Sequence, residues 1–533
     1  MDLFFAALPI GFLIVVMTKK NGLPSTVAFA LAALIAYGVR IWFFGTRPNL
    51  SHAAIVTGVL DALTPISIVL GAIFFFVALE RSGAMETLRL WLNSVSRNRV
   101  AQLMVVGWSF QFLIEGASGF GTPAALAAPV LVGLGFPPLR VAVLCLVMNS
   151  VPVSFGAVGT PTWFGFSSLE LPEAQLLHIG LKTALLHAAA AVVIPAIALR
   201  FVVEWKDIRR NLLFVQLSVF ACVLPMVAIA AFNYEFPAVA GGMIGLLMTI
   251  FLAQHRIGLA KEEGAPQAAE TSPVRGGDVL RALAPLLATV GILLITRIPL
   301  LGLRQLLTSK AEWIAIPLGG LGEFSLSPSL VFQLQGILGE DLHWSHALLY
   351  VPSILPFLVA GVLALWLYHC PPSVFGEVAK ETFARIRNPV IALFGALVFV
   401  QLLMIDGERA STEILGHALA AGTGGLWIYF AAFLGALGSF FSGSNTISNL
   451  TFGGIQISIA EDIGVSPTTI LALQSAGGAL GSMIAIHNIV AVCAVLGLKN
   501  QEGVILKKTI IPALAYGVIL AAVIGILLSV FSF

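Results

Sequence analysis

The sequence predicts an all-α polytopic membrane protein with about 12 full spans and two re-entrant hairpins in two inverted repeats. Hydrophobic residues make up 58% of the 533 residues and charged residues only 10%, whereas soluble domains carry about 25% charged residues. The mean hydropathy of +0.99 points the same way. Short polar, glycine-rich segments also interrupt apolar stretches at matching places in the two halves, a pattern typical of a transporter's binding site.

The first repeat is predicted over residues 1–253. Its candidate full spans are apolar stretches that read as membrane helices. They lie at 2–18, 26–44, 53–79, 139–155, 178–203, 212–232 and 239–253.

The first predicted hairpin, residues 101–135, is centred on the stretch Glu115-Gly-Ala-Ser-Gly-Phe-Gly-Thr-Pro123. The apolar stretches on either side, 101–114 and 123–135, would each reach only about 20 Å as a helix. Neither crosses the membrane alone, so we expect two half-helices that meet at a polar tip. Irregular backbone at that depth is stable only where protein or a water-filled cavity satisfies its hydrogen bonds.

Residues 254–278 are rich in Gly, Ala, Pro and charge, which predicts a cytoplasmic linker. The second repeat, 279–533, contains a second hairpin at 426–460 with the tip Gly438-Ser-Phe-Phe-Ser-Gly-Ser-Asn-Thr446. Its candidate full spans lie at 279–298, 347–369, 392–405, 468–496 and 509–530. The stretch 313–338 is apolar but broken by glycine and proline, and the sequence assigns it to no element.

The distribution of Lys and Arg agrees with this topology. Loops rich in these residues are expected on the cytoplasmic side. With the N-terminus outside and each hairpin entering and leaving on one side, the basic loops all fall inside. These loops lie at 19–20, 81–99, 206–210, 256–281, 380–387 and 499–508. Counting each hairpin as two spans gives the same parity, so charge does not separate these two topologies.

Small hydrogen-bond donors gather at the two predicted tips, where helix N-termini and backbone N–H groups favour an anion. Ordinary helix capping uses the same residue types, but their occurrence at two matched breaks favours binding. The predicted substrate-binding residues are Ser118, Gly119, Gly121, Thr122, Asn149, Ser442, Ser444, Asn445 and Thr446.

Glu115 is the predicted proton-coupling residue, because an ionisable side chain inside a membrane segment is costly and therefore a functional candidate. His487, in a loosened part of a later span, is the alternative. Arg140 is a possible carboxylate partner, although an arginine at the cytoplasmic edge also fits the positive-inside tendency. If Arg140 pairs with Glu115, the carboxylate has a structural role instead.

Several functions are not expected. The net charge of +2 gives no reason to expect a nucleic-acid partner. The four cysteines are far apart and show no metal-ligand spacing, so we expect no metal and no cofactor. The sequence shows no HExxH motif, nucleophile elbow or P-loop, so no catalytic residue is assigned and an enzyme or primary pump is not expected.

These motifs resemble those of the lactate permease family, bacterial carriers of L-lactate, D-lactate and glycolate. The resemblance covers nearly the whole chain and is most specific at 115–123, 149–161 and Gly443-Ser-Asn-Thr446. The family belongs to the ion-transporter superfamily, whose paired hairpins carry Ser-Asn-Thr motifs that hold substrate carboxylates. Here the second hairpin has this motif as Ser444-Asn445-Thr446, while the first has Ala117-Ser118-Gly119 near the equivalent place.

The resemblance implies proton symport of small 2-hydroxy monocarboxylates by a multi-pass protein of the bacterial inner membrane. Sodium coupling, found elsewhere in the superfamily, would need cation ligands that the sequence does not identify. The partners expected are the monocarboxylate, protons and the lipid bilayer; the oligomeric state is not determined. The alternative function is a membrane-embedded enzyme that uses Glu115 and His487 as acid and base.

Overall fold

The computed structural model describes the chain except for residues 19–22, 120–121, 261–274, 298–300, 352–353, 499–500 and 531–533. The side chains of some further helical residues, including Ser118, Thr122 and His487, are also outside the description. Most described residues are helical, as predicted. Most of the predicted linker 254–278 lies outside the described residues.

The chain divides into two compact units, Met1–Leu88 with Arg275–Ala418 and Arg89–Val274 with Leu419–Phe533. Each unit takes one segment from each predicted repeat, so the units do not coincide with the repeats. The repeat boundaries remain a prediction.

The first unit is built around the long helix α19 (Pro372–Met404), which packs against α2, α3 and α4. Proline at its first position suits the start of a helix, because the ring fixes φ and the missing N–H needs no partner there. The unit's other helices are α1 (Asp2–Thr18), α2 (Ser25–Gly38), α3 (Pro48–Asp61), α4 (Leu63–Ser82), α16 (Gly276–Arg297), α17 (Leu303–Leu307) and α18 (Val359–Leu367). Helices α5 (Ala84–Ser94) and α20 (Ser411–Thr423) cross the boundaries between the units in sequence.

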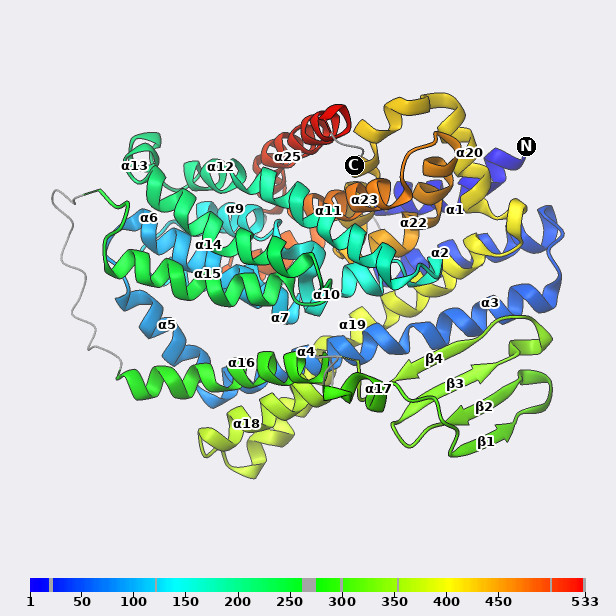
Figure 1. The fold of residues 1–533 in the computed structure, drawn as a ribbon, viewed down its shortest axis with the longest axis horizontal. Coiled ribbons are helices and arrows are strands. Elements are labelled where there is room, and N and C mark those ends of the chain that lie inside the picture. The colour runs from blue at the N-terminus through cyan, green and yellow to red at the C-terminus, as the bar shows by residue number, and fades with distance from the viewer. Residues whose placement is uncertain are drawn as a thin grey trace. The chain divides into compact units, whose positions relative to one another are not determined.

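A four-stranded antiparallel sheet in the first unit corrects the all-α expectation (Figure 1). Its strands pair in chain order: β1 (Ile314–Pro317), β2 (Glu323–Leu326), β3 (Val331–Gln335) and β4 (Trp344–Ala347). The strands come from the unassigned stretch 313–338 and the residues that follow it. Leu334, Ile337 and Trp344 pack against Ala53 of α3. The predicted span at 347–369 is therefore too long, since its apolar helix covers only Ile354–Leu367.

The second unit is entirely helical where it is described. Its helices from the first part of the chain are α6 (Arg99–Gln102), α7 (Gln111–Ser118), α8 (Thr122–Gly133), α9 (Pro138–Met148), α10 (Gly156–Trp163), α11 (Glu173–Ala191), α12 (Ile194–Arg200), α13 (Trp205–Arg210), α14 (Leu212–Ala230) and α15 (Pro237–Gln254). Those from the last part are α21 (Ala431–Ser442), α22 (Asn445–Asp462), α23 (Pro467–Ser482), α24 (Ile486–Leu496) and α25 (Glu502–Val530).

The first limb of the predicted hairpin at 101–135 is longer than expected. The side chain of Asn98 caps the helix by accepting from the amides of Val100 and Ala101, and a π-helical stretch at Leu103–Phe110 joins α6 to α7. Together they give an apolar helix at Arg99–Ala117 that is long enough to cross a membrane. The expectation that both limbs are too short is therefore wrong for this limb.

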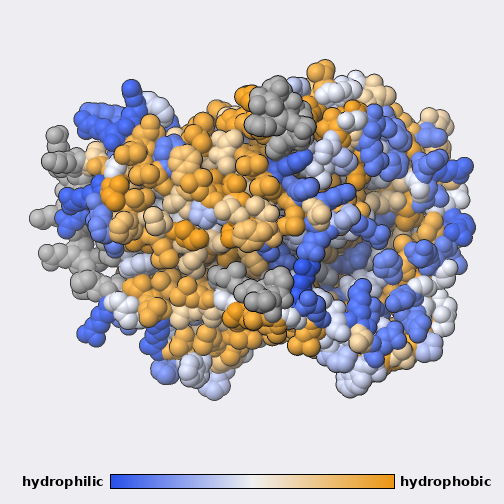
Figure 2. Space-filling model, viewed as in Figure 1, coloured by the Kyte–Doolittle hydropathy of each residue, from blue (hydrophilic) through white to orange (hydrophobic). Residues whose placement is uncertain are grey.

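Among the described residues, 7 helices have the length and apolar composition of a membrane span, or up to 10 if each sharply bent pair counts as one span. Figure 2 shows apolar side chains gathered on the face that carries α14 and α15. Exposed side chains on these helices include Leu224, Leu247 and Phe251. Large apolar side chains exposed along long apolar helices are expected where lipid covers the protein.

Candidate functional site

The first helix break of the site lies between α7 and α8. Gly119 ends α7 with φ +60° and ψ −153°, a conformation that only glycine adopts readily. One turn earlier, Glu115 is buried, with 3% of its surface exposed. Its Oε2 accepts a hydrogen bond of 2.8 Å from Nδ2 of Asn149, the residue that ends α9. Within the described part of the chain, no Lys, Arg or His forms an ion pair with Glu115.

A second break, between α9 and α10, faces Glu115. Gly156 packs directly against the Glu115 carboxylate, and any side chain at this position would collide with it. Three consecutive residues then take left-handed backbone conformations: Ala157, Val158 and Gly159, with φ of 43°, 57° and 70°. Such strain costs on the order of 1–3 kcal/mol per non-glycine residue and is concentrated at functional sites. The predicted span at 139–155 is therefore broken, because α9 ends at Met148 and the chain bends by 57° before the next helical segment.

The third break lies between α21 and α22, at the tip predicted for the second hairpin. Gly443 ends α21 in the left-handed region, and Ser444 caps α22 by accepting from the amide of Ile447 at 3.4 Å. Nδ2 of Asn445, at the first position of α22, donates to Oγ of Ser154 at 3.2 Å and to the carbonyl of Ser475 at 3.0 Å. The first turn of α22 is therefore held in place by the Ser154 side chain and by the backbone carbonyl of Ser475.

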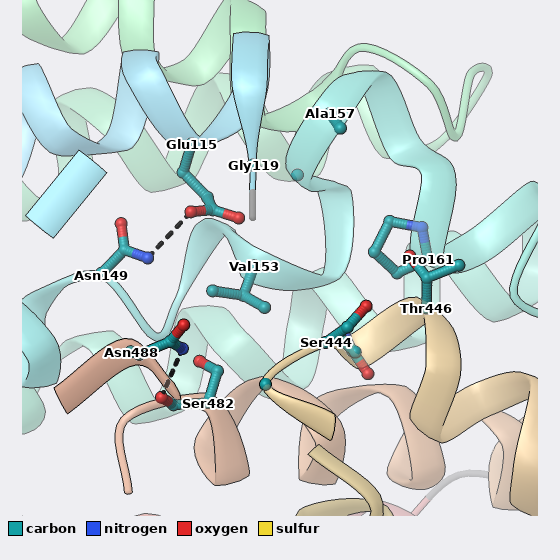
Figure 3. A pocket seen from close by; sticks show the side chains of 13 residues that line it. Glu115, Gly119, Asn149, Val153, Ala157, Pro161, Ser444, Thr446, Ser482 and Asn488 are labelled. Carbon is teal, nitrogen blue, oxygen red and sulfur yellow. Dashed lines mark hydrogen bonds between the residues drawn. The ribbon is translucent and has the colours of Figure 1, made fainter. Parts of the chain in front are cut away.

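These three breaks surround one small cavity of about 30 Å³. It is lined by Glu115, Gly119, Asn149, Val153, Gly156, Ala157, Pro161, Gly443, Ser444, Asn445, Thr446, Ser482 and Asn488. In Figure 3, Glu115 and Asn149 lie above Val153, while Ser444 and Ser482 lie below it. The cavity thus has a carboxyl group on one side and the N-terminus of α22 on the other. Free amides at such a terminus attract negative charge.

Three asparagine side chains in the lining, Asn149, Asn445 and Asn488, have a buried Oδ1 without a hydrogen-bond partner among the described residues. The Oδ1 of Asn445 lies against Gly478, which leaves the other two as candidate acceptors. Asn149 and Asn488 donate through Nδ2, to Glu115 and to the carbonyl of Ser482. Buried polar atoms are nearly always hydrogen-bonded, so these two acceptors call for a donor from a bound molecule or water.

A buried chain of hydrogen bonds leads away from the cavity to His187, which sequence reasoning did not connect to the site. Oγ of Ser154, which accepts from Asn445, lies 2.8 Å from Nε2 of His187. Nδ1 of the same ring lies 2.5 Å from the hydroxyl of Tyr516 on α25. All these residues belong to the second unit. The chain sets the position of Asn445 by linking helices that are far apart in sequence.

The structure brings together six of the predicted residues: Glu115, Gly119, Asn149, Ser444, Asn445 and Thr446 all line the cavity. Ser442 lies beside the tip and accepts from the amide of Ser444. Gly121 and the side chains of Ser118, Thr122 and His487 lie outside the described residues.

Arg140 lines a different cavity. Gly156, Ser482 and Asn488 line the site although they were not predicted. In the described residues, no group of three His, Cys, Asp or Glu could hold a metal ion.

Comparison with known proteins decides the family. The L-lactate permease family profile matches residues 2–531, almost the whole chain. The chain belongs to the L-lactate permease family. A Haemophilus influenzae relative, named as a candidate L-lactate permease, is 48% identical over 96% of both chains. Glycolate permease GlcA of Escherichia coli K12 is 26% identical over 98% of this chain and 94% of its own length. Among solved structures, the Alcanivorax borkumensis YdaH transporter is similar over 95% of this chain and 98% of its own, with a TM-score of 0.45 and 17% identity.

Membership of the L-lactate permease family, together with the apolar helices described above, makes this chain a multi-pass transporter of the bacterial inner membrane. Family membership agrees with the resemblance seen in the motifs at 115–123, 149–161 and 443–446. Two of these motifs lie at helix breaks that line the cavity, and the third spans the break at 149–159.

Proposed function

We propose that the protein takes up small 2-hydroxy monocarboxylates, such as lactate and glycolate, by proton symport. The observation that carries this proposal is the cavity lined by Glu115 on one side and by the first turn of α22 on the other. The names of the relatives, L-lactate permease and glycolate permease, support the substrate class.

The substrate carboxylate is best accommodated by the first turn of α22. Asn445 and Thr446 begin this helix and line the cavity, and the amides of a first turn have no partner within the helix. A single negative charge can be met by such amides and by nearby hydroxyls, without an arginine. The proposal therefore does not need Arg140, which lies in another cavity.

The substrate hydroxyl is assigned to the unused acceptors of Asn149 and Asn488. A 2-hydroxyl group donates one hydrogen bond and so satisfies one of these oxygens. A substrate that lacks the hydroxyl leaves both oxygens buried without a partner, which costs about 1–3 kcal/mol. The site should therefore discriminate against plain monocarboxylates.

Glu115 is proposed as the proton carrier, with His487 as the alternative. A lactate anion that enters alone against a negative-inside potential costs about 2.3 kcal/mol per 100 mV. One accompanying proton makes the step electroneutral and removes this cost. Because a cavity of about 30 Å³ has room for only about two waters, we expect the breaks around it to move apart when the substrate binds. Helix breaks allow this movement without unfolding a continuous helix.

Counterflow in reconstituted vesicles tests the function. Vesicles that contain the protein and unlabelled lactate are expected to accumulate labelled lactate or glycolate transiently, because a carrier exchanges one for the other. Propionate, which lacks the 2-hydroxyl, should compete at least about fivefold more weakly. Failure to accumulate label would contradict transport by a carrier. Equal competition by propionate would contradict the assignment of Asn149 and Asn488 to the hydroxyl.

We also infer that the break after Gly119 and the break at 443–444 are the tips of two oppositely oriented re-entrant hairpins, within about 12 full spans. The first limb of the first hairpin, Arg99–Ala117, would then enter the membrane as a helix of spanning length. Single cysteines at Ser118 and Ser444, in a variant without native cysteines, should both react with a water-soluble thiol reagent. Excess lactate should slow both reactions. A cysteine placed at exposed, lipid-facing Leu224 is the control and should resist the reagent. A tip that stays unreactive would contradict this topology for that hairpin.

A further inference from the structure

A second cavity in the second unit combines three cationic side chains with apolar ones. It encloses about 220 Å³ and is lined by Leu139, Arg140, Val143, Arg200, Phe201 and Lys508. The cations come from three helices, α9, α12 and α25, that pack against one another (Figure 1). The convergence of Arg140, Arg200 and Lys508 is therefore a property of the tertiary structure, since they are far apart in sequence.

Where the chain is described, no acidic side chain pairs with these cations. The lining contains no Asp or Glu. The first unit shows the contrast, because its Arg81 and Arg385 both pair with Glu381, at 2.7 Å and 2.5 Å. Like charges around one cavity repel each other. The cavity is therefore suited to an anion that comes from outside the chain.

The backbone of α9 adds to this preference. Arg140 lies in the first turn of α9, where the positive end of the helix disfavours a cation unless an anion is nearby. The amides of Leu139 and Arg140 belong to the first turn, which has no intrahelical partners for its N–H groups. Both residues line the cavity. Together with the two guanidinium groups, these donors suit the several oxygens of a phosphate group.

The apolar part of the lining favours a lipid over a soluble anion. Leu139, Val143 and Phe201 form the rest of the cavity wall. Further along α25, Ile511 and Leu514 are exposed, as expected for side chains that face acyl chains. Basic cavities between membrane helices on the cytoplasmic side are suited to anionic head groups. The basic segments that contain or adjoin Arg200 and Lys508 are predicted to be cytoplasmic.

We propose that this cavity binds the phosphate of an anionic membrane lipid, with Arg140, Arg200 and Lys508 around the head group and the acyl chains against α25. This site is separate from the transport cavity, since the two share no lining residue. If this cavity does not bind lipid, the proposed transport function still stands, because that function rests on other residues.

The test uses the full-length protein in phosphatidylcholine nanodiscs with increasing fractions of phosphatidylglycerol. The melting temperature of the wild type should rise with phosphatidylglycerol. The triple variant Arg140→Gln/Arg200→Gln/Lys508→Gln should need roughly a hundredfold more of this lipid for the same rise, at about 1 kcal/mol per cation. Should the triple variant not fold, Lys508→Gln alone should need roughly fivefold more.

The matched control is Arg209→Gln/Arg210→Gln/Lys507→Gln. It removes the same charge from exposed residues that do not line the cavity. A lipid response like that of the wild type in this control supports the proposal. An equal loss in both triple variants would mean that only general surface charge attracts the lipid, and would overturn it. Inorganic phosphate that stabilises the wild type as much as phosphatidylglycerol does would overturn the assignment to a lipid.

Discussion

Replacing Glu115 with glutamine is expected to abolish lactate accumulation driven by a pH gradient while exchange of labelled lactate continues. Glutamine keeps the shape of the side chain and an oxygen that can accept from Asn149, so the cavity should survive. It cannot bind and release a proton. With one proton per lactate, a gradient of one pH unit supports about tenfold accumulation. The variant should reach only equal concentrations on both sides.

The measurement is uptake of labelled lactate into vesicles with an acidic exterior, compared with exchange at equal pH. Glu461→Gln is the control, because this carboxyl is exposed near the end of α22 and does not line the cavity. It should keep both activities. If Glu115→Gln retains driven uptake with the pH dependence of the wild type, Glu115 does not carry the proton. His487→Gln then becomes the next variant to measure.

Replacing Asn445 with alanine is expected to raise the apparent KM for lactate about ten- to a hundredfold, with normal amounts of protein in the membrane. The change removes both hydrogen bonds that hold the first turn of α22, to Ser154 and Ser475. With the first turn no longer held in place, its amides should lose a hydrogen bond to the substrate carboxylate, and loss of a hydrogen bond to a charged group costs about 1.5–3 kcal/mol. Initial rates of uptake over a range of lactate concentrations measure the effect. Thr451→Ala, further along α22, is the control, because Thr451 does not line the cavity and its hydroxyl donates to the carbonyl of Ile447 in the same helix.

Replacing His187 should also raise the apparent KM for lactate, because His187 contacts Ser154, which holds Asn445. His187→Phe removes the contact with Ser154 Oγ and should raise KM by about fivefold, since one neutral hydrogen bond is worth about 1 kcal/mol. In the double variant with Asn445→Ala the two effects should not add, because both residues act through one chain. Fully additive effects would show that His187 acts independently of Asn445. If Asn445→Ala leaves the KM for lactate unchanged, the tip of α22 is not part of the binding site.

The membrane class and two of the three helix breaks, those between α7 and α8 and between α21 and α22, were predictable from the sequence, because they depend on local properties. Apolar composition decides which segments can lie in lipid, and glycine decides where a helix can end. Gly443 and Ser444 illustrate this, since a left-handed glycine followed by a capping serine ends one helix and starts the next. Glu115 was also detectable, since a lone carboxylate in an apolar stretch is rare and costly.

Hydropathy along the sequence predicted helix limits and strands less reliably, because these depend on capping residues and on packing against other elements. The first limb of the hairpin at 101–135 is longer than the apolar count suggested, because Asn98 caps the helix before its apolar part begins. The sheet at 314–347 was missed because its strands are short and separated by glycines and prolines. Its stability comes from cross-strand pairing and from packing on α3.

Only the tertiary structure decided which residues share a cavity. Asn445 and Ser154 are 291 residues apart, and His187 and Tyr516 are 329 apart. Contacts over such separations are set by how helices pack, and hydropathy or spacing along the chain carries no signal for them. Helix packing also explains why Arg140 does not pair with Glu115. The two are near each other in sequence, yet the packing of α9 against α12 and α25 places Arg140 with Arg200 and Lys508 instead.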